Sequence, residues 1–266
     1  MKMVAAAKLR RAQTRLTNAR PYATKAKEVL DSMVRLVEGA PHPIFVPRET
    51  PRVAEFLILT SDRGLCGGFN SNLLRRVENF IKEKQIVCPE IRIRVVGRKG
   101  RDYFKARKRE LADVMTNTPD NPPFEESLKL ANDLIEGYQT GRFDEFYLVY
   151  NYFRSAISQT IQIDPILPIK KAEVSGPTYV PEYIYEPSRT ALLEKLIPKT
   201  LATMIHRAFL ESVTGELGSR MVAMDNATNN CREMIFDLTL QMNRARQAAI
   251  TTELMDIVNG AESLKK

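Results

Sequence analysis

The stretch LGSRMVAMDNATNNCREMIFDLTLQMNRARQAA, residues 217–249, carries the clearest structural pattern in the chain. It lies inside a longer segment, 199–259, that contains no proline. Apolar residues recur there at alternating steps of four and three, which is typical of a helix that packs along one seam in a coiled coil. The seam consists of Leu217, Met221, Met224, Thr228, Cys231, Ile235, Leu238, Met242, Ala245 and Ala249. At about 1.5 Å per residue, the segment predicts a helix about 90 Å long, which is too long for a compact domain and must project.

The N-terminal segment has the same periodicity. Its seam consists of Leu9, Ala12, Leu16, Ala19, Ala23, Ala26, Leu30, Met33 and Val37. Pro21 removes one backbone donor, but the register continues in phase across it, so we predict a kinked helix that carries on. A glycine and proline cluster at 39–43 ends it. Because one chain enters and leaves the part between the two helices, we expect them to run antiparallel, in close contact through alanine.

Residues 53–170 have a different pattern. Short apolar runs at 53–60, 91–97 and 143–153 read as strands, and 69–84 and 124–138 read as helices, so the alternation predicts a small open α/β sheet of Rossmann-like type. Residues 155–169 alternate apolar and polar side chains and predict one or two edge strands. The fold class is therefore α/β with a long antiparallel coiled coil. The predicted parts are an N-terminal coiled-coil helix (1–40), an α/β globular domain (50–170), a linker (171–188) and a C-terminal coiled-coil helix (189–260).

The segment SDRGLCGGFN, residues 61–70, follows a predicted strand and precedes a predicted helix. Many phosphate-binding loops have this order of elements. However, the segment lacks both the GK[ST] ending of a Walker loop and the GxGxxG spacing of a dinucleotide site. We therefore expect Gly64, Gly67 and Gly68 to permit a tight turn with positive φ, and Asn70 or Ser71 to cap the next helix. No catalytic residue, cofactor or metal site is predicted.

Charge and cysteine content narrow the function classes. The net charge is +8, with basic clusters at 2–27 and 92–109 that favour acidic partners. The three cysteines are widely spaced, which supports neither a disulfide framework nor a zinc site. No apolar run is long enough to span a membrane, and the N-terminus does not read as a signal peptide. A basic coiled-coil nucleic-acid-binding protein is the main alternative, and a small α/β enzyme with a helical appendage is the second.

Three motifs together resemble the gamma subunit of F-type ATP synthase. They are MKMVAAAKLRRAQ at 1–13, SDRGLCGGFN at 61–70 and MDNATNNCREMIFDLTLQMNRARQAAITTELMDIVNGA at 224–261. The resemblance implies a non-catalytic central-stalk rotor, with a coiled-coil shaft inside a ring of alpha and beta subunits. It also implies that the globular part contacts the epsilon subunit and the c-ring. The expected protein has no cofactor, no direct small-molecule substrate and no nucleic-acid partner, and it is peripheral to the cytoplasmic side of a bacterial cell membrane.

The same resemblance implies a set of contacts with the beta subunits. The residues are Lys2, Met3 and Lys8, near an acidic beta-subunit loop; Arg244, Arg246 and Gln247, which hydrogen-bond to beta-subunit loops; and Thr251 and Glu253, at positions linked to coupling. The chain departs from the family at both ends. It begins inside the first motif, so the expected start lies upstream or the N-terminal helix is short, and its last residues, 260–266, are more polar than is usual. Cys66 and Cys88 do not form the closely spaced pair of chloroplast members, so no redox control is expected.

Overall fold

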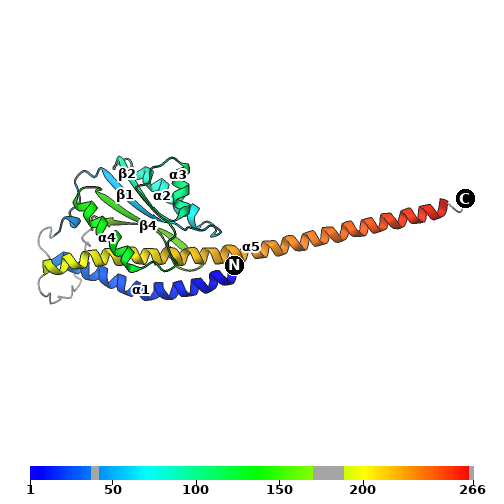
Figure 1. The fold of residues 1–266 in the computed structure, drawn as a ribbon, viewed down its shortest axis with the longest axis horizontal. Helices are drawn as coiled ribbons and strands as arrows, with labels where there is room; N and C mark the ends of the chain where they lie inside the picture. The colour runs from blue at the N-terminus through cyan, green and yellow to red at the C-terminus, as the bar shows by residue number, and fades with distance from the viewer. Residues whose placement is uncertain (37–41, 170–188, 264–266) are drawn as a thin grey trace, which may run out of the picture. The chain divides into compact units, whose positions relative to one another are not determined.

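A computed structural model describes residues 1–36, 42–169 and 189–263. The chain divides into two units, Met1–Val222 and Ala223–Lys266. The first unit holds an open sheet with helices on both faces and a pair of long helices beside it (Figure 1). The second unit holds the C-terminal part of the last helix.

The sheet has five strands in the order β3-β2-β1-β4-β5. The strands are β1 (Val53–Leu59), β2 (Glu90–Val96), β3 (Asp113–Met115), β4 (Glu145–Phe153) and β5 (Gln159–Leu167). The first four pair in parallel, and β5 runs antiparallel to β4 at the edge. The predicted strands and the predicted edge strand are confirmed. The three-residue strand β3 was not predicted.

Helices cover both faces of the sheet. The shorter ones are η1 (Pro43–Phe45), α2 (Phe69–Lys84), α3 (Arg98–Ala106) and α4 (Phe124–Gln139). From β1 the chain moves outward through β2 to β3, and it then returns past β1 to β4. Because parallel crossovers are right-handed, this reversal places α2 and α3 on one face and α4 on the other. The two apolar clusters agree, since side chains of α2 and α3 share one cluster and those of α4 share the other.

The two long helices are α1 (Lys2–Leu36) and α5 (Arg189–Ser263). The first part of α5 packs on the α4 face of the sheet, and α1 packs against α5 (Figure 1). Leu9 and Leu16 share a cluster with Leu210 and Leu217, whereas Leu30 shares a cluster with the earlier residues 193–209 of α5. The pair is therefore antiparallel, as predicted.

The helix α1 continues through Pro21, which confirms that the proline does not end it. The glycine and proline cluster at 39–43 lies mostly outside the described residues, and so does the predicted linker at 171–188.

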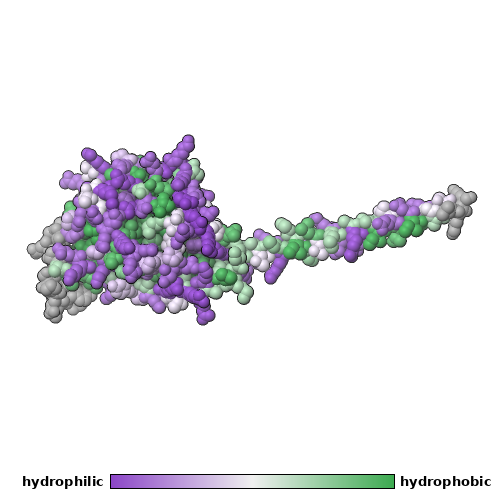
Figure 2. Space-filling model, viewed as in Figure 1, coloured by the Kyte–Doolittle hydropathy of each residue, from purple (hydrophilic) through white to green (hydrophobic). Residues whose placement is uncertain are grey.

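Among the described residues, the apolar cluster shared with α1 includes the seam of α5 as far as Met221, and Met224 is half-buried. From residue 226 onward most side chains are exposed; Ile235, Leu238 and Met242, for example, are each more than half exposed. Apolar residues, green in Figure 2, recur along this helix of the second unit. Among the described residues, no helix combines the length and the apolar character that a membrane crossing requires.

Candidate functional site

The N-terminal turns of α1 carry the first group of predicted contact residues. Lys2 and Met3 are exposed, and the Met3 side chain is 84% exposed. The Lys8 ammonium lies 2.6 Å from the Asp120 carboxylate, which belongs to the segment between β3 and α4. Both side chains are about half exposed, so solvent screens this ion pair and its contribution to stability is small. The Lys8 side chain is therefore open to solvent while it is paired with Asp120.

The second group lies on the helix of the second unit, where all five residues are exposed. Arg244, Gln247 and Thr251 are spaced by three and four and share one face of the helix. Arg246 and Glu253 are seven apart and share a different face. The Thr251 hydroxyl donates to the Gln247 carbonyl oxygen of the preceding turn at 2.8 Å, so its hydrogen-bonding group is satisfied within the helix. The five predicted contacts therefore divide into two faces that can meet different neighbours.

This helix exposes large apolar side chains on every side. They are Met234, Ile235, Phe236, Leu238, Met242, Ile250, Leu254, Met255, Ile257 and Val258, each between 49% and 67% exposed. Successive residues such as 234, 235 and 236 point in directions about 100° apart, so these side chains do not form one stripe. A soluble protein rarely exposes such a continuous apolar surface unless a partner covers it. The helix is therefore suited to be surrounded, and not merely contacted along one side.

The segment 61–70 forms a tight turn between β1 and α2. Gly67 has φ of +57°, as predicted, but Gly68 has φ of −80° and the other positive angle belongs to Leu65, at +62°. The predicted cap is wrong, because Gly68 occupies the cap position and no side chain caps the helix. Asn70 instead holds the turn from inside α2, accepting from the Ser61 backbone N–H at 3.0 Å and donating to the Ser61 hydroxyl at 2.8 Å.

The three cysteines are not paired. Cys66 and Cys88 are buried, and Cys231 is exposed. Burial raises the pKa of the Cys66 thiol, so this side chain is a weak nucleophile at neutral pH. The Asn70 amide also donates to the Cys66 sulfur, at 3.3 Å, which makes the thiol part of the turn.

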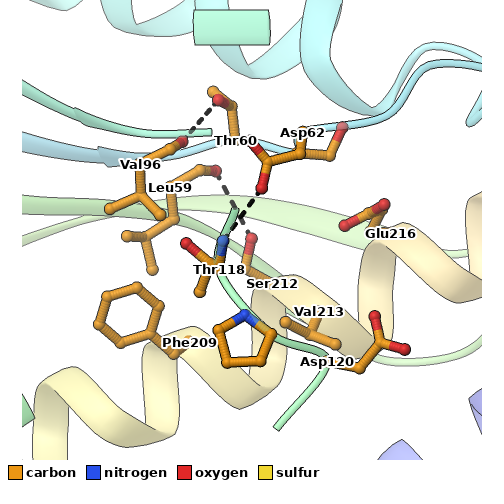
Figure 3. Close-up of a pocket in the computed structure, with 12 residues that line it drawn as sticks. Leu59, Thr60, Asp62, Val96, Thr118, Asp120, Phe209, Ser212, Val213 and Glu216 are labelled. Carbon is orange, nitrogen blue, oxygen red and sulfur yellow. Dashed lines mark hydrogen bonds between the residues drawn. The ribbon is translucent and has the colours of Figure 1, made fainter. Parts of the chain in front are cut away.

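A small pocket lies at the carboxyl ends of β1 and β2 (Figure 3). In open α/β sheets this edge is where ligands bind, beside the point at which the strand order reverses. Here side chains of α5 occupy it: Phe209, Ser212 and Val213 line the pocket, and Ser212 donates to the carbonyl oxygen of Leu59 at 3.5 Å. The remaining volume is about 30 Å³, the size of one water molecule. A helix of the chain itself thus fills the place of a nucleotide.

The acidic side chains that line this pocket also disfavour the binding of phosphate. Asp62, Asp120 and Glu216 all line it. Burial raises the pKa of Glu216, the two aspartates act in the same direction, and the ion pair with Arg220 acts against them. Asp62 accepts from the backbone N–H of Thr118 at 3.1 Å. Within the described residues, no group of three or more acidic, histidine or cysteine side chains is placed to hold a metal ion.

Five arginines of the basic cluster at 92–109 form ion pairs within the chain. Its ion pairs are Arg92 with Glu90, Arg94 with Glu55 and Asp133, Arg98 with Asp62, Arg101 with Asp102, and Arg107 with Glu78. The Arg94 side chain is only 11% exposed. This cluster is therefore not a continuous free cationic surface, which counts against the nucleic-acid alternative.

Sequence reasoning missed the polar contacts that tie α5 to the rest of the first unit. Arg220 donates to Glu216 at 2.5 Å and to the carbonyl oxygen of Gly64 at 3.3 Å. Glu211 binds Arg20 of α1. Arg220 and Glu216 are four positions apart within α5, but the contacts of Arg220 with Gly64 and of Glu211 with Arg20 join residues more than 150 positions apart, so no local spacing could indicate those two.

The family model described as ATP synthase matches residues 1–264. The chain is 49% identical to the ATP synthase gamma chain of Geobacter metallireducens over 265 residues, covering 100% of this chain and 92% of that one. The chain belongs to the ATP synthase gamma chain family. A second gamma chain, from Brevibacillus brevis, is 45% identical and is covered to 91% of its length.

Solved structures of ATP synthase rotors have the same fold as this gamma-family chain. The central stalk with c-ring of the Tetrahymena thermophila mitochondrial enzyme aligns with a TM-score of 0.62 and 25% identity, over 86% of this chain and 97% of that one. A chain of the Euglena gracilis mitochondrial enzyme aligns with a TM-score of 0.63 at 19% identity, over 97% and 95% of the two chains. The long helices and the sheet are thus shared with rotor subunits.

Proposed function

We propose that this chain is the non-catalytic rotor subunit of a proton-translocating F-type ATP synthase. Its partners are the alpha and beta subunits of the catalytic ring, the epsilon subunit and the c-ring of the membrane sector. The observation that carries the proposal is the helix of residues 223–263, whose apolar side chains are exposed on all sides. Such a surface suits a shaft surrounded by a ring of subunits.

The rotor acts through differences in contact free energy. A single helix that presents Arg244 and Gln247 on one face and Arg246 on another has no threefold symmetry. Three identical beta subunits around it therefore meet different surfaces at any moment. A contact that favours one conformation of a beta subunit changes the affinity of that subunit for nucleotide by the same free energy. Rotation moves these contacts from one subunit to the next, and the rotor itself carries out no covalent step.

We assign the beta-subunit contacts to the residues predicted from the sequence. These are Lys2, Met3, Lys8, Arg244, Arg246, Gln247, Thr251 and Glu253. Their chemistry supports the assignment, because arginine and glutamine donate to carboxylates and backbone carbonyls, and Lys8 already binds a carboxylate within its own chain. We place the protein at the cytoplasmic side of a bacterial membrane, held there by the membrane sector of the complex.

The test is the double replacement Arg246→Ala with Gln247→Ala in the assembled enzyme. Alanine favours helix, and both side chains are exposed, so the fold of the chain is unaffected. We expect ATP hydrolysis and ATP-driven proton pumping to fall, with assembly reduced if the contacts also hold the complex together.

The matched control is Arg232→Ala with Gln241→Ala. It removes the same two residue types from exposed positions of the same helix that lie outside the predicted contact set. ATP hydrolysis and proton pumping should fall less in the control variant than in the test variant. Equal rates in the wild type and in both double variants would reject these residues as beta-subunit contacts.

A further inference from the structure

A buried polar node joins α1, α5 and β4. Glu211 of α5 has a side chain that is 0% exposed, and Arg20 of α1 reaches it with two parallel hydrogen bonds. Arg20 Nε donates to Glu211 Oε1 at 2.9 Å, and Nη2 donates to Oε2 at 2.8 Å. Such bidentate pairs fix the relative orientation of both side chains as well as their distance.

The backbone of Phe153 in β4 completes the node. Its N–H donates to Glu211 Oε2 at 3.0 Å, and its carbonyl oxygen accepts from Arg20 Nη2 at 2.6 Å. The guanidinium carbon of Arg20 lies 4.9 Å from the centre of the Tyr152 ring, also in β4. The hydrogen bonds to Glu211 raise the pKa of Arg20, so its guanidinium stays protonated. One carboxylate thus connects a sheet strand to both long helices.

The two helices also meet through apolar side chains. Next to the node these are Leu9, Ala12 and Leu16 of α1 with Leu210 and Leu217 of α5, and nearer the start of α5 Leu30 of α1 shares the main core with residues 193–209. Apolar burial is less directional than a hydrogen bond, so the small cluster at Leu210 and Leu217 fixes the rotation of these turns of α5 less sharply than the burial of residues 193–209 fixes the start of the helix. Directional polar contacts at residue 211 and beyond make up this difference.

Further polar contacts follow along the same face of α5. The Gln159 amide of β5 donates to the Gly215 carbonyl oxygen and to the Ser219 hydroxyl, each at 2.8 Å. Positions 211, 215 and 219 are four residues apart and therefore lie on one face of the helix. These turns immediately precede residue 223, where the second unit begins, and α5 is continuous to Ser263.

We propose that Arg20 and Glu211 are positioning residues that fix the rotation of α5 within the first unit and thereby transmit torque to the helix beyond residue 222. This inference rests on the proposed rotor function. Without the node, the turns of α5 from residue 211 to 222 are held less tightly and can twist, while residues 193–209 stay packed in the core of the sheet. Part of the rotation driven by hydrolysis then fails to reach the partners of the first unit.

A second buried ion pair in the chain serves as a control, because its loss shows what the removal of a purely structural pair does. Glu55 of β1 is also buried, with a side chain 1% exposed, and it is ion-paired with Arg94 of β2. Arg94 in turn contacts Asp133 of α4 at 2.6 Å. This second buried carboxylate joins β1, β2 and α4 instead of the two long helices. Replacing either glutamate with glutamine removes one buried carboxyl group from the same unit.

The experiment uses ATP synthase assembled with this chain and reconstituted into lipid vesicles. The variants are Glu211→Gln, Arg20→Lys and Glu55→Gln. Arg20→Lys keeps the charge but loses the bidentate geometry, and its position is 34% exposed, so it decides the question if Glu211→Gln does not assemble. For each we measure protons pumped per ATP hydrolysed, and the torsional stiffness of the rotor from the angular fluctuations of a bead attached to the c-ring.

We expect Glu211→Gln and Arg20→Lys to lose pumping per ATP and torsional stiffness, and Glu55→Gln to keep wild-type values of both. The inference is overturned if the first two variants keep the wild-type ratio and stiffness, or if Glu55→Gln loses as much as they do. Failure of the proposed function gives a different result. In that case the wild-type chain itself does not assemble into the enzyme, or it supports hydrolysis without pumping.

Discussion

Gly97 occupies a backbone conformation that no other residue tolerates well, and its replacement by alanine is the sharpest test of the fold. It lies between β2 and α3 with φ of +97° and ψ of 144°. A Cβ at this position would lie 2.7 Å from the carbonyl carbon of Thr60 and closer still to the carbonyl oxygen. Thr60 cannot withdraw easily, because its N–H donates to the Val96 carbonyl oxygen at 2.8 Å.

Two separate costs follow for Gly97→Ala. The backbone conformation costs about 1–3 kcal/mol in a residue with a Cβ. The overlap with the Thr60 backbone adds about 1–3 kcal/mol, as for other overpacked sites. The sum is about 2–6 kcal/mol, a large part of the total stability of about 5–15 kcal/mol that is usual for a folded domain.

The assay is urea unfolding followed by the near-ultraviolet signal of tyrosine. The chain has nine tyrosines and no tryptophan, and none of the tyrosines lies in residues 223–266, so the signal reports the first unit alone. Gly64→Ala is the control, since its Cβ would lie 3.5 Å from a lysine side-chain carbon, an ordinary contact. We expect the control to change the free energy of unfolding by less than about 0.5 kcal/mol. A Gly97→Ala value within about 1 kcal/mol of the wild type would refute the close approach of the two backbones.

Three further outcomes are expected. Gly67→Val should lower the free energy of unfolding by about 1–2 kcal/mol, because a β-branched side chain is strained at φ of +57°, and an unshifted melting temperature would contradict this. Burial raises the pKa of Tyr147 to about 12 from 10.0, so the unfolded chain loses this proton first and stability should fall by about 2–3 kcal/mol as pH rises through that window. Tyr147→Phe should remove this part of the fall. Lys8→Met should change stability by less than about 1 kcal/mol, since its ion pair is exposed, and a larger loss in urea unfolding would show that the pair is structural.

The sequence predicted those parts of the fold that depend on local periodicity. The seam of α1 is buried from Leu9 to Met33 except at Ala19 and Ala26, which are half-buried, and the strands of the sheet core lie where their apolar runs do. The helix α3 was missed because its nine residues bury only Gly100 and Phe104, too few to produce a helical pattern. The strand β3 has three residues and no periodicity to read.

The candidate site was only partly accessible to sequence reasoning. The exposed residues of the second unit follow from the family motif, and their division into two faces follows from helix geometry. The node at Arg20 and Glu211 could not be predicted, because its partners are 191 positions apart and meet only after the sheet, α1 and α5 have assembled. The sequence also could not predict where the pairing of the two helices ends. The heptad pattern of α5 continues unchanged past Met221, whereas the apolar cluster shared with α1 ends there.

The unpartnered state of the helix of residues 223–263 has a cost for the cell. Phe236, Met255 and Ile257 are each more than half open to water, and a newly made chain carries them until the ring closes around it. An unassembled copy therefore presents an apolar surface that favours aggregation. Balanced synthesis of this chain and its ring, with docking soon after translation, is therefore a requirement that follows from the shape of the rotor surface alone.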